Sequence, residues 1–225
     1  MSLKLYFLLF ILYSFIGWVM EVIYTKIKDG NWVNRGFLLG TICPIYGSGC
    51  ILMILLLSRY KNDLFVLFFM AIIICSILEY LTSFILEKLF DARWWDYSDR
   101  KLNINGRICL ETMIPFGILG CLLICFVQPF ILKLLNKLPE IILTGVAVLF
   151  LIVFIIDLIL SFSIISKLKE TSKKALKKVR IKDNTEEISR KVRDYLSNYS
   201  KYGKRLIQSF PNIKILVDRY RKKRK

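Results

Sequence analysis

The chain has 225 residues, of which 56% are hydrophobic and none is histidine, and its formal net charge is +17. This apolar content is well above that of soluble domains, so it excludes a soluble globular protein and indicates a membrane protein. The missing histidine excludes histidine bases and histidine-ligated metal sites, and the missing G-x-x-x-x-G-K-[ST] motif excludes an ATPase of the P-loop type.

Five apolar runs of about 20 residues predict transmembrane helices, because a helix of that length crosses the hydrocarbon core of a bilayer. These runs cover Leu3–Tyr24, Gly36–Leu57, Leu64–Leu86, Ile108–Leu135 and Ile141–Ile165. The predicted fold is an all-α polytopic bundle over residues 1–165, followed by a basic, partly helical tail over residues 166–225.

The first two runs carry one acid, one arginine and a series of small residues. Glu21 shares a predicted helix face with Ser14 and Gly17. An acid in a span needs a partner or a wet cavity, unless it lies near enough to the helix end to reach the membrane surface. Arg35 precedes the second run, and Pro44 within that run predicts a kink or a break. Small residues that favour close helix packing recur there every three or four positions: Gly36, Gly40, Cys43, Gly47 and Cys50.

The third run places four side chains on one stripe, at positions four residues apart: Cys75, Glu79, Ser83 and Glu87. Glu79 lies roughly 12 Å deeper than Glu87, at 1.5 Å per residue. A short acid does not easily reach water from that depth, so Glu79 is either a functional group or half of a buried structural ion pair. Its expected partners in an ion pair are Arg35 and Arg107.

A polar stretch from Glu87 to Glu111, with the sequence EKLFDARWWDYSDRKLNINGRICLE, interrupts the apolar part of the chain. Trp and Tyr beside charges suit a membrane–water boundary, so this stretch is either a solvated connector or a structured loop. Arg107 and Glu111, four residues apart, are expected to share a helix face. The candidates for a solute site, an ion site or a gate are Glu21, Arg35, Glu79, Glu87, Arg93, Trp95, Asp96, Arg107 and Glu111.

The fifth run contains Asp157, which has the same two interpretations as Glu79. From Lys167 onward the chain has 21 Lys or Arg and 6 Asp or Glu, a surplus of 15 positive charges. By the positive-inside rule this tail is cytoplasmic, and with five spans the N-terminus lies outside. The candidate charges then fall in the cytoplasmic half of the bundle. The tail also predicts binding to anionic lipids, and nucleic acid is not expected as a partner beside a bilayer.

Five segments resemble a bacterial family of ABC-transporter type IV membrane proteins, also called CmpB-like. They are SFIGWVMEVIY (Ser14–Tyr24), NRGFLLGTICPIYG (Asn34–Gly47), LEYLTSFILEKLF (Leu78–Phe90), ARWWDYSD (Ala92–Asp99) and NINGRICLE (Asn103–Glu111). The resemblance covers roughly Leu3–Gly120 and implies a multi-pass permease subunit of the bacterial inner membrane that works with a separate ATPase. It implies no catalytic residue. Its polar motif positions match Glu21, Arg35, Glu79, Trp95, Asp96, Arg107 and Glu111.

Three functions are compatible with these features. The first is a transport-type subunit in which the acid–Arg cluster is a solute site, an ion site or a gate. The second is a membrane enzyme acting on lipid headgroups or lipid-linked substrates, in which carboxylates and arginines hold a divalent cation and a phosphate. The third is a structural or regulatory protein whose tail recruits a partner. The transport function is the expected one, with no cofactor and no confident metal site.

Overall fold

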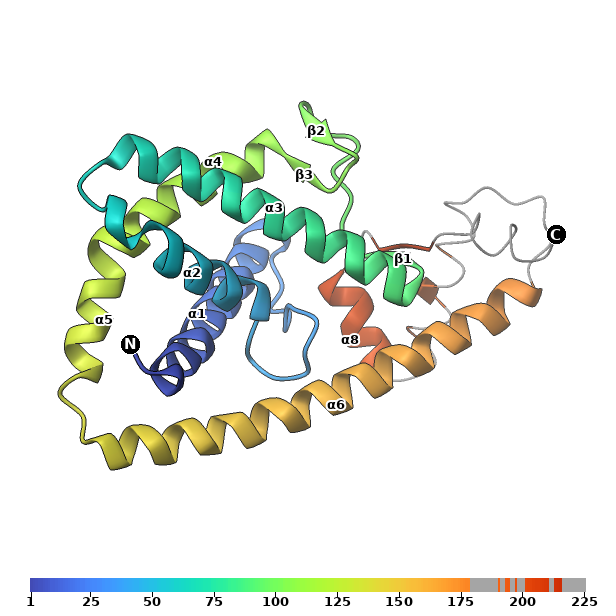
Figure 1. The fold of residues 1–225 in the computed structure, drawn as a ribbon. Coiled ribbons are helices and arrows are strands. Elements are labelled where there is room, and N and C mark those ends of the chain that lie inside the picture. Colours follow the sequence, from blue (N-terminus) through green and yellow to red (C-terminus); the bar gives the residue numbers. More distant parts are fainter. Residues whose placement is uncertain (179–189, 191–192, 195–196, 198–200, 211–212, 216–225) are drawn as a thin grey trace.

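A computed structural model of the chain describes residues 1–178, 190, 193–194, 197, 201–210 and 213–215 (Figure 1). The helices are α1 (Leu3–Asp29), α2 (Pro44–Leu57), α3 (Leu64–Phe90), α4 (Leu110–Leu122), α5 (Gln128–Leu135), α6 (Glu140–Lys178) and α8 (Lys201–Ser209). A 3-10 turn, η1 (Ser58–Tyr60), follows α2, and a π-helical turn, η2 (Leu123–Val127), joins α4 to α5. The strands are β1 (Ala92–Arg93), β2 (Asn103–Ile104), β3 (Ile108–Cys109) and β4 (Lys214–Ile215).

Four helical segments in the described part of the chain are long and apolar enough to cross a membrane. They cover Leu3–Asp29, Leu64–Phe90, Leu110–Leu135 and Glu140–Ser166. Their outer faces expose large apolar side chains such as Phe65, Phe126 and Ile159, as contact with lipid requires. The chain is therefore a multi-pass membrane protein, and the predicted all-α bundle is confirmed.

The second predicted span differs from the structure, because its helix begins at Pro44 and not at Gly36. Proline has no N–H to donate and is favoured in the first helical turn, where no donor is needed. Residues 36–43 are not helical, and Gly36 has a left-handed φ of 104°. The predicted helical stripe of small residues is therefore wrong for Gly36, Gly40 and Cys43, which precede the helix. Helix α2 has 14 residues and is about 21 Å long, shorter than a full span.

Close packing of small residues is nevertheless found where α1 crosses α2. A Cβ atom on Gly47 would meet Ser14 and the backbone oxygen of Phe10, and one on Gly17 would meet the ring of Tyr46. Glycine at both positions lets the two backbones approach, which is how small residues favour helix association in membranes.

Successive segments run in alternating directions, so the bundle has two distinct ends. At one end Lys4 pairs with Glu140, and Leu57 and Leu67 belong to one apolar cluster. This end holds the larger apolar core, which α1, α2, α3, η2 and α5 build from Leu9, Tyr13, Met53, Ile54, Leu57, Leu67, Ala71, Cys75, Leu123, Ile124 and Ile131. The other end holds the polar connection between α3 and α4, and we call it the polar end.

Part of the basic tail returns to the polar end. Helix α6 continues past the apolar run to Lys178, and α8 then lies beside it (Figure 1). Leu206 and Ile213 are buried in a small apolar core that also contains Phe90, Trp94 and Ile165. Strand β4 pairs antiparallel with β1, which ties the tail to the α3–α4 connection. This docking was not predicted, because a short and strongly basic segment does not indicate which surface it contacts.

Candidate functional site

The polar stripe on α3 is the base of the site. Cys75, Glu79, Ser83 and Glu87 are all buried, as the four-residue spacing predicts for one face of a helix. The stripe faces α2, α4 and the loop over residues 91–109. Two acids inside an apolar bundle need partners, so their contacts decide what this site can do.

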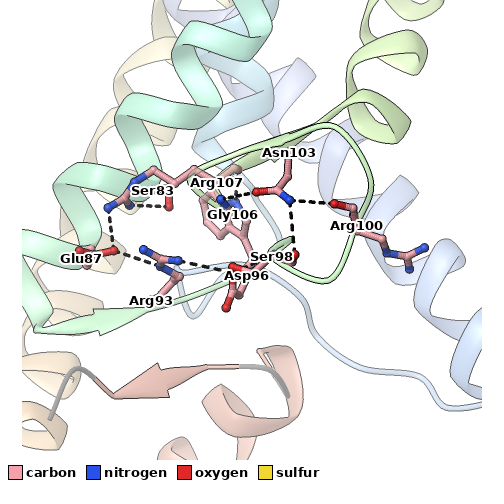
Figure 2. A network of polar contacts seen from close by, with 10 residues as sticks. Ser83, Glu87, Arg93, Asp96, Ser98, Arg100, Asn103, Gly106 and Arg107 are labelled. Atoms are coloured by element: carbon pink, nitrogen blue, oxygen red, sulfur yellow. Dashed lines mark hydrogen bonds and ion pairs between the residues drawn. The ribbon is translucent and has the colours of Figure 1, made fainter. Parts of the chain in front are cut away.

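Glu87 lies at the centre of a chain of ion pairs (Figure 2). Its Oε2 is 2.8 Å from Nη2 of Arg107 and 3.2 Å from Nε of Arg93. Arg93 also pairs with Asp96 at 3.4 Å. Arg107 is 6% exposed, donates to Ser83 Oγ at 3.1 Å, and lies over the ring of Tyr80. The two acids and two arginines therefore compensate one another away from bulk water.

The loop that supplies Arg93 and Asp96 is folded by its own hydrogen bonds. Asp96 Oδ1 accepts from the backbone N–H and the hydroxyl of Ser98, at 3.1 and 2.5 Å. Tyr97 N donates to Gly106 O at 2.8 Å, and Asn103 Oδ1 accepts from Gly106 N at 2.9 Å. Gly106 has a φ of 65°, and a Cβ there would collide with Asp96 and Ser98. The predicted polar loop is thus a structured platform.

This platform holds Tyr97 over Glu79. The phenol donates to Glu79 Oε1 at 3.2 Å. Burial raises the pKa of Tyr97 above its usual range, and the carboxylates of Glu79 and Glu21 raise it further. The phenol therefore stays protonated and acts as a donor. The two acids face one interior region, although they come from different helices.

Glu21 is the second acid of this region and has two partners. Its Oε2 is 3.3 Å from Nε of Arg35, and its Oε1 accepts from the Tyr46 hydroxyl at 2.6 Å. Arg35 also donates to the backbone oxygen of Ser209 in α8. One arginine thus connects the end of α1 to the docked tail.

Asp157 of α6 holds the irregular backbone before α2. Its carboxylate accepts from the N–H groups of Leu39 and Gly40, both at 3.0 Å, and from Ser161 Oγ at 3.1 Å. On the same segment, Arg205 of α8 donates to the backbone oxygens of Gly36 and Leu38. Non-helical backbone inside a bundle needs such internal partners, which explains an acid in the fifth apolar run.

Not every predicted site residue belongs to the buried cluster. Glu111 does not pair with Arg107, because residues 103–109 form a hairpin and α4 begins only at Leu110. Its side chain is 61% exposed and pairs with Arg100 at 3.0 Å. Trp95 serves the loop, donating through Nε1 to Arg107 O at 3.0 Å. Glu21, Arg35, Glu79, Glu87, Arg93, Asp96 and Arg107 do lie at the polar end.

Two tyrosines of the cluster were missed from the sequence. Tyr46 and Tyr97 each donate to a buried acid, and both lie beside recognisable turn residues, in CPIYG and WWDYSD. A tyrosine near a predicted acid in such a turn is the available signal. Among the residues that the structure describes, no group of three or more Cys, Asp or Glu is placed to hold a metal ion.

Comparison with known proteins gives one match. The model of the family described as Putative ABC-transporter type IV matches residues 8–162. No curated protein and no solved structure matches the chain. The matched range reaches the fifth apolar run, which the resemblance over Leu3–Gly120 did not include, and ends before the basic tail.

Proposed function

The chain belongs to the ABC-transporter type IV family, and from this premise we propose that it is a transport-type permease subunit working with a separate ATPase. The observation that carries the proposal is the buried network of Glu87, Arg93, Asp96 and Arg107 beside the acids Glu21 and Glu79. Charges in a membrane bundle are costly, and they characteristically mark solute pathways, ion pathways and gates.

The network suits a gate or a binding site because its parts come from different elements. Glu87 belongs to α3, Arg93 and Asp96 to the loop, and Arg107 to the hairpin before α4. A movement of α4 or of the loop would change which arginine pairs with Glu87. A displacement at the polar end would therefore alter the charge environment of the acids on α3. Buried ion pairs stabilise little by themselves, but they select one arrangement over another.

We further propose that the polar end faces the cytoplasm, with the N-terminus outside. The tail after Ser166 starts from this end and carries the surplus of basic residues, which the positive-inside rule retains in the cytoplasm. In that orientation the loop over residues 91–109 is the surface that a cytoplasmic ATPase can reach.

Site-directed photo-crosslinking in native membranes tests this function. A photoreactive amino acid at Asp99, exposed on the loop, is expected to capture a protein that contains a P-loop ATPase motif. The matched control places the same group at Lys61, which is exposed at the opposite end. Capture from Lys61 and not from Asp99 would contradict the orientation, and capture of no nucleotide-binding protein from Asp99 would reject the ATPase partnership.

The basic tail is expected to bind anionic lipids. Each Lys or Arg close to an anionic surface contributes up to about 1 kcal/mol, and the attraction falls as salt screens the charges. A peptide covering Lys167–Lys225 is expected to sediment with anionic vesicles and to be released as the salt concentration rises. Equal binding to neutral vesicles would contradict an electrostatic role.

A further inference from the structure

One buried acid at the polar end lacks the compensation that the others have. Glu87, Asp96 and Glu21 each pair with an arginine, and Asp157 accepts from two backbone N–H groups. Glu79 is 8% exposed, and no Lys or Arg in the described ranges forms an ion pair with it. Its Oε1 accepts from Tyr97, while its Oε2 is buried without a hydrogen-bond partner.

The groups that the structure describes around Glu79 form no ion pair with it, and the Arg107 guanidinium beside Ser83 on the same stripe is already paired with Glu87. Those within electrostatic range are the phenols of Tyr46 and Tyr97, the thiol of Cys75 and the carboxylate of Glu21. The Thr112 hydroxyl also faces Glu79, but it donates to the backbone oxygen of Cys109 at 2.9 Å. A negative charge on Glu79 would therefore meet another acid and a single donor.

These contacts favour a neutral side chain at this position. A buried carboxylate needs a cation or several donors, whereas a neutral carboxyl group is much less costly to bury. Glu21 keeps its charge because Arg35 compensates it, and this fixed charge opposes a second one nearby. Oε2 of Glu79 has no hydrogen-bond partner, and a proton bound there removes both the buried charge and its repulsion by Glu21.

We propose that Glu79 is an exchangeable proton site, with Tyr97 as the donor that positions its carboxyl group. The proton is taken up from water onto Oε2 and is returned to water when a cation or a second donor reaches the carboxylate. Because Tyr97 is carried by the loop that Arg93 and Asp96 anchor, movement of that loop changes the environment of the proton. The inference deepens the proposed function by naming a proton as the ion coupled to transport. The coupling to transport rests on the proposed function, whereas the proton site itself does not.

Infrared spectroscopy of the full chain in lipid nanodiscs tests the proton directly. At neutral pH the wild type is expected to show the carbonyl stretch of a protonated carboxyl group, shifted by exchange into deuterated water. Glu79→Gln has the same shape and is neutral, and it is expected to remove this band. The matched control Glu111→Gln, at an exposed acid, is expected to retain it. Tyr97→Phe is expected to retain the band at a shifted frequency, because it loses the hydrogen bond to Oε1.

Three results would overturn the proposal: no band in the wild type, a band unchanged in Glu79→Gln, or a band without any shift in Tyr97→Phe. If Glu79→Gln fails to fold, the frequency of the band in Tyr97→Phe decides whether the protonated group is Glu79. A missing band together with wild-type stabilisation by Na⁺ or K⁺ would replace the proton by a metal cation. Loss of the ATPase partnership would leave the infrared result unchanged, so failure of the proposed function is distinguishable from failure of the proton site.

Discussion

Replacing Arg107 with methionine is expected to lower the free energy of unfolding by about 3–5 kcal/mol, as removal of one partner from a buried ion pair does. The change removes the 2.8 Å ion pair with Glu87, which is 6% exposed, and it removes the bond to Ser83 Oγ. The contact of the guanidinium with the Tyr80 ring is lost as well. Reversible unfolding in mixed detergent micelles measures the difference.

The matched control is Arg100→Met, because Arg100 lies on the same loop and its pair with Glu111 of α4 is exposed. An exposed pair contributes about 0–1 kcal/mol, so this variant is expected to remain close to the wild type. The double variant Arg107→Met with Glu87→Leu is expected to recover part of the loss, since apolar residues often replace a buried pair without cost. Equal losses in Arg107→Met and Arg100→Met would show that burial of the network contributes nothing.

The second large effect is expected at Asp157. Replacement by leucine removes the carboxylate that accepts from the Gly40 N–H and leaves the Leu39 N–H with Ser161 Oγ, at about 1–3 kcal/mol for a buried group that loses its acceptor. The irregular segment over residues 36–43 is then expected to open. In a background whose only cysteine is Cys43, which is buried, a faster reaction with maleimide reports this opening.

Two glycine substitutions provide an independent check on Asp157. A Cβ atom on Gly40 would lie 2.6 Å from Asp157 Oδ2, so Gly40→Ala is expected to weaken the same contact. A Cβ on Gly145 in α6 would meet nothing within 4 Å, and alanine in a helix is favoured over glycine by about 1 kcal/mol. Similar labelling of Cys43 in both alanine variants would contradict a role for Asp157 in holding the segment.

The sequence predicted well which positions place an acid in an apolar run, and it predicted the partners of these acids less well. Glu79 and Glu87 stand out because acids are rare in apolar runs, and their spacing gives one buried face. Pro44 marked the position of the break, although helix propensity could not show that the whole segment before it, residues 36–43, is not helical. Apolar runs therefore locate the spans, while breaks within them depend on tertiary contacts.

The predicted pairing of Arg107 with Glu111 was wrong because the backbone before Leu110 is not helical. Arg107 and Glu111 were expected on one helix face, but the left-handed residues Leu102, Asn105 and Gly106 turn the chain into a hairpin instead. Arg107 consequently points toward Glu87 (Figure 2). The return of α8 to the polar end was also beyond the sequence, because the apolar face of a nine-residue helix does not indicate which surface it contacts.

The contacts of the segment over residues 36–43 set an order for biogenesis. Leu39 lies 118 residues before its acceptor Asp157, and Leu38 lies 167 residues before its donor Arg205. At about 5–20 residues per second, the ribosome reaches Asp157 roughly 6–24 s after Leu39. During that interval Asp157 has not been synthesised, so the N–H groups of Leu39 and Gly40 lack this acceptor. We therefore expect the insertion machinery to keep the stretch hydrated or sheltered, and a nascent chain arrested before Asp157 to be a substrate for membrane quality control.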